Sequence, residues 1–279
     1  MKELDPFVLK DLLKAYLLED LGHGDITSCH VPGREKTATA VIRAKEEGVL
    51  AGMPVAAETF SLLDPRAKTE PLAQDGAAIA KGTELATVTG PAFALLRAER
   101  TALNILQRLS GIATTTRKMV DLIASTGTRL VDTRKTTPGL RLLEKYAVTM
   151  GGACNHRMGL YDCAMVKDNH IKVAGSIKDA VSAVRKAIPF TARIEVEVKD
   201  LGELKEALDA GAHLVLLDNM DLSTLRQAVD QAKGKALTEA SGNMTPENIL
   251  AVAQTGVDYI SSGAIIHHAT WLDMNMKIL

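Results

Sequence analysis

Three short clusters between Asp132 and His170 gather cationic side chains suited to binding a small anion. They are Asp132-Thr133-Arg134-Lys135-Thr136, Asn155-His156-Arg157 and Lys167-Asp168-Asn169-His170. Residues 129–172 hold eight Lys or Arg against four Asp or Glu, whereas the whole chain of 279 residues has a formal net charge of −1. Arginine offers a planar fork for carboxylate or phosphate, and lysine offers a mobile point charge. The pattern predicts a small ligand with several negative charges.

Carboxylates alternate with apolar residues in the segment Arg193-Ile194-Glu195-Val196-Glu197-Val198. In a strand this alternation places Glu195 and Glu197 on one face and the apolar residues on the other. We expect the apolar face to meet helices, which leaves both carboxylates pointing inward, where they need a cation or a metal. Together with Asp218, at the end of the next predicted strand, they could hold Mg²⁺ through a few carboxylates plus substrate oxygens.

From about Gly111 the chain alternates between predicted strands and helices. Strands are expected over 128–132, 163–167, 193–198, 214–218, 236–240 and 257–261, and helices over 112–125, 177–187, 201–210, 222–232 and 246–255. A polar group stands at the end of each strand, and an α/β barrel gathers such groups at its C-terminal mouth. A doubly wound sheet also fits the alternation, but the set of polar strand ends favours a barrel.

Two glycine-containing segments late in the chain predict a phosphate cradle. Ser241-Gly242-Asn243 leads into an expected helix that is capped by Thr245, with Pro246 at its first position. Ser261-Ser262-Gly263 follows the last predicted strand, and barrel phosphate sites commonly use loops after the late strands. The pair His267-His268 has no third metal ligand nearby, and we interpret it as structural.

The first 110 residues read as a compact domain of mixed helices and strands. The periodicity predicts helices over the first ~20 residues, over 54–63 and over 91–110, the last closed by Gly111. Strands are expected over 37–44, 48–52 and 84–90.

Composition excludes several classes of protein. Hydrophobic residues make up 46% of the chain and aromatic residues only 3%, which favours helices packed on a parallel sheet. The near-zero net charge and few aromatic residues argue against a nucleic-acid partner. No apolar run approaches the ~18 residues that span a bilayer. The first residues lack the apolar stretch of a signal peptide, and three cysteines without CxxC spacing read as free thiols, so we expect a cytoplasmic protein.

Seven motifs in order give the chain a resemblance to a known family. They are Glu99-Arg100-Thr101-Ala102-Leu103-Asn104, Asp132-Thr133-Arg134-Lys135-Thr136-Thr137-Pro138-Gly139, Asn155-His156-Arg157, Lys167-Asp168-Asn169-His170, Glu195-Val196-Glu197-Val198, Leu217-Asp218-Asn219 and Glu239-Ala240-Ser241-Gly242-Asn243. The set is similar to the quinolinate phosphoribosyltransferases, and the resemblance covers essentially the whole chain. One departure is Ala153 after Gly151-Gly152, where the family usually has a third glycine, and it affects only the local loop.

The resemblance implies an N-terminal α/β sandwich domain over 1–110 and a C-terminal open parallel α/β barrel over 111–265. The tail, 266–279, would return to the first domain. The family forms homodimers in which each barrel mouth is completed by the neighbour's N-terminal domain, and assembly into a higher oligomer is compatible with this. Arg100 would then reach across the interface to the partner's substrate.

The resemblance also implies roles for individual residues. The residues that would surround the two carboxylates of quinolinate are Arg134, His156, Arg157 and Lys167. Lys135 would meet the pyrophosphate of phosphoribosyl pyrophosphate, with Glu197 and Asp218 near its Mg²⁺ and ribose. The 5′-phosphate would be held by Ser241, Gly242 and Gly263.

The reaction implied is transfer of the phosphoribosyl group to quinolinate with decarboxylation, which gives nicotinate mononucleotide, pyrophosphate and CO₂ in NAD biosynthesis. Three other interpretations remain open. A paralogous transferase could act on another acidic heterocycle, and a barrel lyase could use Lys167 as a Schiff base. A non-catalytic metabolite-binding subunit is the third, but nothing expected at the site is visibly missing.

Overall fold

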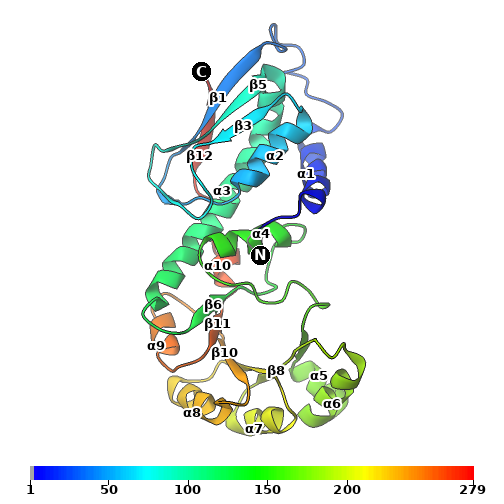
Figure 1. Cartoon of the computed structure of the whole chain (residues 1–279), viewed down its shortest axis with the longest axis vertical. Helices are drawn as coiled ribbons and strands as arrows, with labels where there is room; N and C mark the ends of the chain where they lie inside the picture. Colours follow the sequence, from blue (N-terminus) through cyan, green and yellow to red (C-terminus); the bar gives the residue numbers. More distant parts are fainter. Residues whose placement is uncertain (1–2) are drawn as a thin grey trace. The chain divides into compact units, whose positions relative to one another are not determined.

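The structure is a computed structural model that describes residues 3–279 and divides into two compact units. The first unit comprises the described residues up to Arg117 together with Leu143–Gly152 and Ala269–Leu279. The second comprises Lys118–Leu142 and Ala153–His268. Each unit is built around its own β-sheet, antiparallel in the first and parallel in the second (Figure 1).

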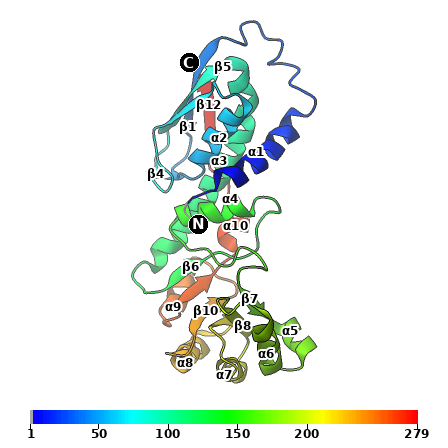
Figure 2. The same ribbon diagram turned by 45° about the vertical axis from the view of Figure 1, so that its right-hand side comes forward.

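The first unit is an antiparallel sheet with helices packed on one face (Figures 1 and 2). Its strands, in spatial order, are β12 (Met274–Ile278), β1 (Thr37–Ala44), β5 (Glu84–Pro91) and β3 (Lys68–Pro71). The helices are α1 (Pro6–Leu21), α2 (Met53–Leu63) and α3 (Ala92–Ile123), and the short strands β2 (Gly48–Val49) and β4 (Ala78–Ile79) pair separately. Phe60 of α2 and Leu95 and Leu106 of α3 are fully buried against Ile42 and Leu85 of the sheet. Burial of this apolar surface is what joins the helices to the sheet.

The predicted helix end at Gly111 is wrong, because α3 runs through this residue to Ile123. A Cβ atom at Gly111 would lie 1.9 Å from the carbonyl oxygen of Thr270. Glycine therefore allows the helix and the C-terminal segment to approach closely. In the sequence, a glycine with this role looks the same as a glycine that ends a helix.

The C-terminal tail adds the edge strand of the first unit's sheet. Strand β12 pairs antiparallel with β1, in a register from Ala40↔Ile278 to Ala44↔Met274. Helix α4 (Arg141–Met150), which the sequence analysis missed, also belongs largely to this unit and buries Glu144 completely.

The second unit is an open parallel α/β barrel, and the two sheets confirm the predicted α/β class. Its strands are β6 (Arg129–Val131), β7 (Ala164–Val166), β8 (Ile194–Val198), β9 (Leu214–Asp218), β10 (Leu237–Ser241) and β11 (Tyr259–Ser261), in the order β6-β11-β10-β9-β8-β7. Within residues 3–279, β6 and β7 do not pair with each other, which leaves the barrel open between them. A single bridge, Val131↔Cys154, extends the β6 edge.

Helices between the barrel strands cover the outside of the sheet (Figure 1). They are α5 (Asp168–Ala174), α6 (Ile177–Ala187), α7 (Leu201–Asp209), α8 (Leu222–Ala232) and α9 (Ile249–Ala253), whereas α10 (Ala264–His267) follows the last barrel strand, β11. The predicted helix start at Pro246, capped by Thr245, is wrong: α9 begins at Ile249. The Asn248 side chain accepts from the Thr245 backbone N–H at 2.9 Å and donates to the Asn243 carbonyl at 3.0 Å, so these residues form a turn instead.

None of the described helices combines the length and apolar character needed to cross a membrane.

Candidate active site

A cavity of about 970 Å³ lies at the C-terminal ends of the barrel strands. Of the eleven predicted site residues, the eight that line it are Arg134, Lys135, His156, Arg157, Lys167, Glu197, Asp218 and Ser241. The structure thus brings together residues that are up to 107 positions apart in the chain, as 241 − 134 gives. We refer to this cavity as the mouth.

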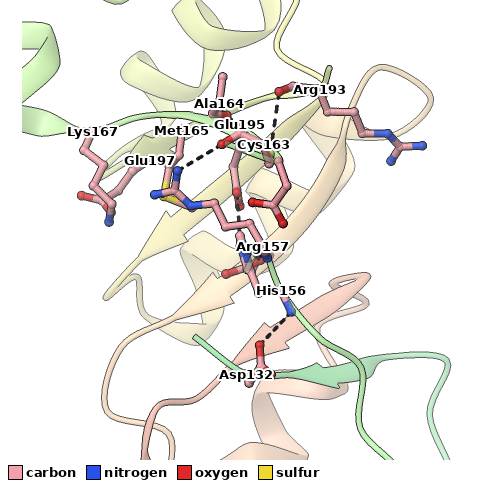
Figure 3. Close-up of polar contacts among 12 residues, drawn as sticks. Asp132, His156, Arg157, Cys163, Ala164, Met165, Lys167, Arg193, Glu195 and Glu197 are labelled. Carbon is pink, nitrogen blue, oxygen red and sulfur yellow. Dashed lines mark hydrogen bonds and ion pairs between the residues drawn. The ribbon is translucent and has the colours of Figure 1, made fainter. Parts of the chain in front are cut away.

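The turn that carries His156 is held by the buried carboxylate of Asp132, at the end of β6. One carboxylate oxygen accepts from the His156 backbone N–H at 2.8 Å (Figure 3). The other accepts from the Asn155 side-chain amide at 2.7 Å. Asp132 is fully buried. Backbone and side-chain donors together satisfy its charge, so the turn has one defined conformation.

The imidazole of His156 points into the barrel, toward two glutamates from strands two apart in the sheet. Its Nε2 lies 3.2 Å from a carboxylate oxygen of Glu195 on β8 and 3.2 Å from one of Glu239 on β10. Burial by itself would lower the pKa of His156, but the contacts with the two glutamates outweigh it and raise the pKa to about 10. Burial also raises the pKa of the Glu195 carboxyl.

Arg157 follows directly and is anchored within its own loop. Its guanidinium donates to the Cys163 carbonyl at 3.1 Å and contacts the Met165 sulfur at 3.5 Å (Figure 3). The Arg157 backbone N–H lies 2.6 Å from Nδ1 of His156. These contacts hold the Arg157 guanidinium next to β7, where it lines the mouth.

Lys167 and Glu197 form an ion pair at the ends of β7 and β8. The Lys167 Nζ lies 2.5 Å from a Glu197 carboxylate oxygen, and the glutamate side chain is 19% exposed. The Lys167 backbone N–H also donates to Nδ1 of His170 at 2.9 Å, which fixes the first turn of α5. The alternation of β8 therefore does point both glutamates inward, and each meets a different cationic partner.

The ends of β9 and β10 meet at a strained pair of turns. Asn219 and Asn243 both have positive φ, 53° and 44°. The Asn219 backbone N–H donates to the Ser241 carbonyl at 2.9 Å, and a Cβ at Gly242 would lie 2.2 Å from the Asn219 side-chain oxygen. Such conformations in residues other than glycine cluster at functional sites. They keep the Asp218 and Ser241 backbones close together at the mouth.

Gly263, after β11, lies beside Lys135 and His267. A Cβ at this position would be 2.9 Å from the Lys135 side chain and 3.0 Å from Nε2 of His267. Burial, then the charges of His268 and Lys135, lower the pKa of His267. The sequence analysis interpreted His267 as structural, and the structure places it beside Gly263.

Arg100 lies on the exposed surface of α3 in the first unit. Its role across a dimer interface stays a prediction.

One group of three side chains in residues 3–279, His156, Glu195 and Glu239, lies close enough together to hold a metal ion without other ligands. The hydrogen bond at Nδ1 argues against it. If Nδ1 accepts the Arg157 N–H, the ring proton must be on Nε2, the atom that would have to bind the metal. In this tautomer Nε2 carries a proton and cannot coordinate a metal.

Comparisons with known proteins cover nearly the whole chain. The family model "Quinolinate phosphoribosyl transferase, N-terminal domain" matches residues 25–110, and the model of the C-terminal domain matches residues 112–277.

Individual relatives agree with these matches. A probable nicotinate-nucleotide pyrophosphorylase (carboxylating) of Synechocystis is 48% identical over 280 residues, covering 99% of this chain and 95% of the relative. A mitochondrial quinolinate phosphoribosyltransferase (decarboxylating) of Nicotiana tabacum is 40% identical over 289 residues, covering 97% of this chain and 82% of the relative. The crystal structure of NadC from Streptococcus pyogenes superposes with a TM-score of 0.95 at 39% identity, covering 100% of this chain and 99% of that one.

Proposed function

Because the chain belongs to the quinolinate phosphoribosyl transferase family, we propose that it transfers the phosphoribosyl group of phosphoribosyl pyrophosphate to quinolinate with loss of CO₂. The products are nicotinate mononucleotide, pyrophosphate and CO₂. One observation carries the proposal: a single mouth is lined both by four Lys or Arg side chains and by three carboxylates, Glu197, Asp218 and Glu239, from adjacent strands. Cations suit two anionic substrates, and the carboxylates suit a developing positive charge.

Quinolinate carries two carboxylates, and we assign them to the cations on β6, β7 and the loop between them. These residues are Arg134, His156, Arg157 and Lys167. Arg157 and His156 come from a turn anchored by Asp132, so they can be in place before substrate arrives. A preformed set of cations reduces the conformational entropy lost on binding.

Phosphoribosyl pyrophosphate takes the opposite side of the mouth in this proposal. Lys135 neutralises the pyrophosphate, and Ser241, Gly242 and Gly263 surround the 5′-phosphate. The absence of a Cβ at Gly263 leaves Lys135 and His267 close to the strand end. That arrangement supplies cationic and N–H donors where a phosphate needs them.

Glu197 and Asp218 suit Mg²⁺ by the chemistry of their donors. They are carboxylates at the ends of neighbouring parallel strands that line one cavity. Mg²⁺ in such sites typically has one or two protein carboxylates and completes its shell with waters and substrate phosphates. When bound, the ion supplies positive charge beside the departing pyrophosphate.

The residues of the mouth act mainly through position and charge. As the bond between ribose and pyrophosphate breaks, positive charge develops on the ribose, and Glu197 and Asp218 stabilise it. The ring nitrogen of quinolinate forms the new bond to C1′ and becomes cationic. The adjacent C–C bond then breaks toward that cationic ring, CO₂ leaves, and a proton adds at the vacated carbon.

Two further assignments belong to the same proposal. The chain works as a homodimer in which Arg100 completes the partner's site, with further assembly of dimers left to measurement. It works in the cytoplasm, which the three free cysteines, Cys29, Cys154 and Cys163, support because thiols stay reduced there.

The test is incubation of the purified protein with quinolinate, phosphoribosyl pyrophosphate and Mg²⁺, following nicotinate mononucleotide and CO₂. A parallel reaction contains nicotinate in place of quinolinate. Product from quinolinate alone supports the proposal. No product from either substrate would contradict it and would point to another acidic heterocycle. A borohydride-trapped adduct at Lys167 would instead favour a lyase, which the Lys167–Glu197 ion pair argues against.

A further inference from the structure

Two buried carboxylates in the barrel interior have no part in the mechanism proposed above. Glu195 of β8 is 0% exposed and Glu239 of β10 is 3% exposed. Inward-facing side chains on alternate barrel strands meet in one layer, which is why these two approach each other. Both approach the same atom, Nε2 of His156, at 3.2 Å.

We propose that Glu195 and Glu239 are positioning residues that orient the His156 imidazole beneath the mouth and make it a cationic contact for the dicarboxylate substrate. The inference rests on the proposed function, because it concerns how that substrate is held. Neither glutamate needs to touch the substrate. Their effect reaches it through the ring of His156 and through the adjacent Arg157.

The orientation of the ring follows from contacts on three sides. Asp132 holds the His156 backbone N–H, the two glutamates flank Nε2, and the Arg157 backbone N–H faces Nδ1. The Nε2 contacts with the two glutamates remain when the ring is protonated, and rotation of the ring would break them. The ring therefore has one preferred orientation.

The charge of the ring follows from the unsatisfied carboxylates. Both oxygens of Glu195 and one of Glu239 are buried without a hydrogen-bond partner that meets normal geometry in residues 3–279. One N–H on Nε2 cannot point directly at two oxygens on different strands, so the contacts at 3.2 Å are primarily electrostatic. Buried negative charge with so few donors strongly favours a cation next to it, and the imidazolium is in that position. The raised pKa of His156, about 10, agrees with this.

One contact opposes protonation of the ring. The Arg157 N–H, 2.6 Å from Nδ1, favours an unprotonated nitrogen there. It is a neutral donor, whereas the two glutamates provide charge-assisted contacts, which are roughly twice as strong. A protonated ring gives up the amide contact. The Arg157 N–H is then a donor that can meet a substrate carboxylate beside the cationic ring.

Other titratable and charged groups lie around the ring. Besides Glu195 and Glu239, the titratable or charged side chains that line the two cavities next to it are Arg129, Arg134, Lys135, Cys154, Arg157, Asp162, Cys163, Lys167, His170, Arg193, Glu197, Asp218 and Tyr259. Arg157 is the cation nearest in sequence and opposes protonation of the ring. Only Glu195 and Glu239 raise the pKa of His156 by direct contact.

The experiment measures quinolinate binding by titration calorimetry from about pH 6 to about pH 9, without the second substrate, for wild type, Glu239→Gln and Glu195→Gln. Quinolinate keeps its charge over this range, so changes in Kd report on the protein. We expect a nearly constant Kd in wild type. Each variant should bind almost as well at the acid end and about tenfold or more weakly at the alkaline end, because the pKa of His156 returns toward 6.5.

Controls separate this effect from misfolding. Glu70→Gln makes the same chemical change at an exposed site of the first unit and should keep the flat profile. Near-normal binding at low pH by a glutamine variant itself shows that the variant is folded. If Glu239→Gln does not fold, Glu195→Gln carries the test. In the His156→Asn background, adding Glu239→Gln should not make the Kd for quinolinate depend on pH. This is expected because Glu239 acts on binding through His156.

Three results would overturn the inference. The first is a flat pH profile in both glutamine variants. The second is a pH dependence that persists in the double variant His156→Asn/Glu239→Gln. The third is tight Mn²⁺ or Zn²⁺ binding to the wild type that is lost in Glu239→Gln, since a metal would replace the proton. Failure of the wild type to bind quinolinate at any pH would instead contradict the proposed function.

Discussion

Both units bury glutamates, and the two sites satisfy them differently. In the first unit, Arg108 donates to a single Glu144 oxygen from Nε at 3.1 Å and from Nη2 at 2.8 Å. The same guanidinium donates from Nη1 to the Ala269 carbonyl at 2.9 Å. In the second unit, Glu195 and Glu239 share one imidazole.

This difference distinguishes a buried charge that stabilises the fold from a buried charge that can influence ligand binding. Arginine is a permanent cation with several donors, and Arg108 pairs with Glu144 and ties α3 to the start of the C-terminal segment. An imidazole shared by two acids can gain or lose its proton. The negative charge of the two glutamates can therefore set the charge of the imidazole, and with it the affinity of the neighbouring site for an anion. The predictions below test this contrast from the largest expected effect to the smallest.

Arg108→Ala should break the structural site outright. It leaves the carboxylate of Glu144 buried without its guanidinium, which typically costs about 3–5 kcal/mol of folding free energy. Urea unfolding measures the loss, and the exposed Arg226→Ala on α8 is the matched control. If the free energy of unfolding falls by no more than in the control, the pair of Arg108 and Glu144 contributes no more to stability than a surface charge.

Arg134→Ala should show the opposite behaviour. Arg134 is exposed at the mouth, so its removal should change the free energy of unfolding by less than about 0.5 kcal/mol. The loss of transition-state binding should instead be about 2–4 kcal/mol, measured as kcat/KM for quinolinate. An unchanged kcat/KM would remove Arg134 from the proposed site.

Gly111→Ala should destabilise the first unit by about 1–3 kcal/mol, because the new methyl group overlaps the Thr270 carbonyl. Alanine is otherwise the better helix former, so propensity alone predicts a gain in stability. Thermal unfolding distinguishes the expected loss of stability from the gain that propensity predicts. The comparison is Gly127→Ala, because Gly127 is exposed and no atom lies near the added Cβ.

The pH dependence of stability should reveal the shared imidazole. The pKa of His156 is raised in the folded state, from 6.5 to about 10, so the folded state holds this proton more tightly than the unfolded state. Its contribution is complete below about pH 6.5 and is lost as the pH rises toward 10. Urea unfolding at several pH values should show this decline in wild type. A decline of equal size in His156→Asn would assign it to other groups.

Much of the fold was predictable because its elements are local. The bounds of β1 and of most barrel strands match within two residues, since alternation and β-branched residues mark a strand without reference to its neighbours. Helices α4 and α5 were missed because their sequences carry site residues or buried charges in place of a simple apolar stripe. The predicted helix end at Gly111 was wrong because this glycine makes room for Thr270, which lies 159 residues further along the chain (270 − 111).

The sequence by itself determined which side chains are available. Clustered cations, the alternation of Glu195 and Glu197, and the polar strand ends are local patterns, and they were sufficient to predict an anion site at a barrel mouth. Only the tertiary structure decided how these charges pair. Glu195 meets His156 while Glu197 meets Lys167, and Glu239 joins the first pair from a strand two places away. The physical reason is that alternation sets the face of a strand, whereas the partner of a buried charge depends on strand order and on the closure of the barrel.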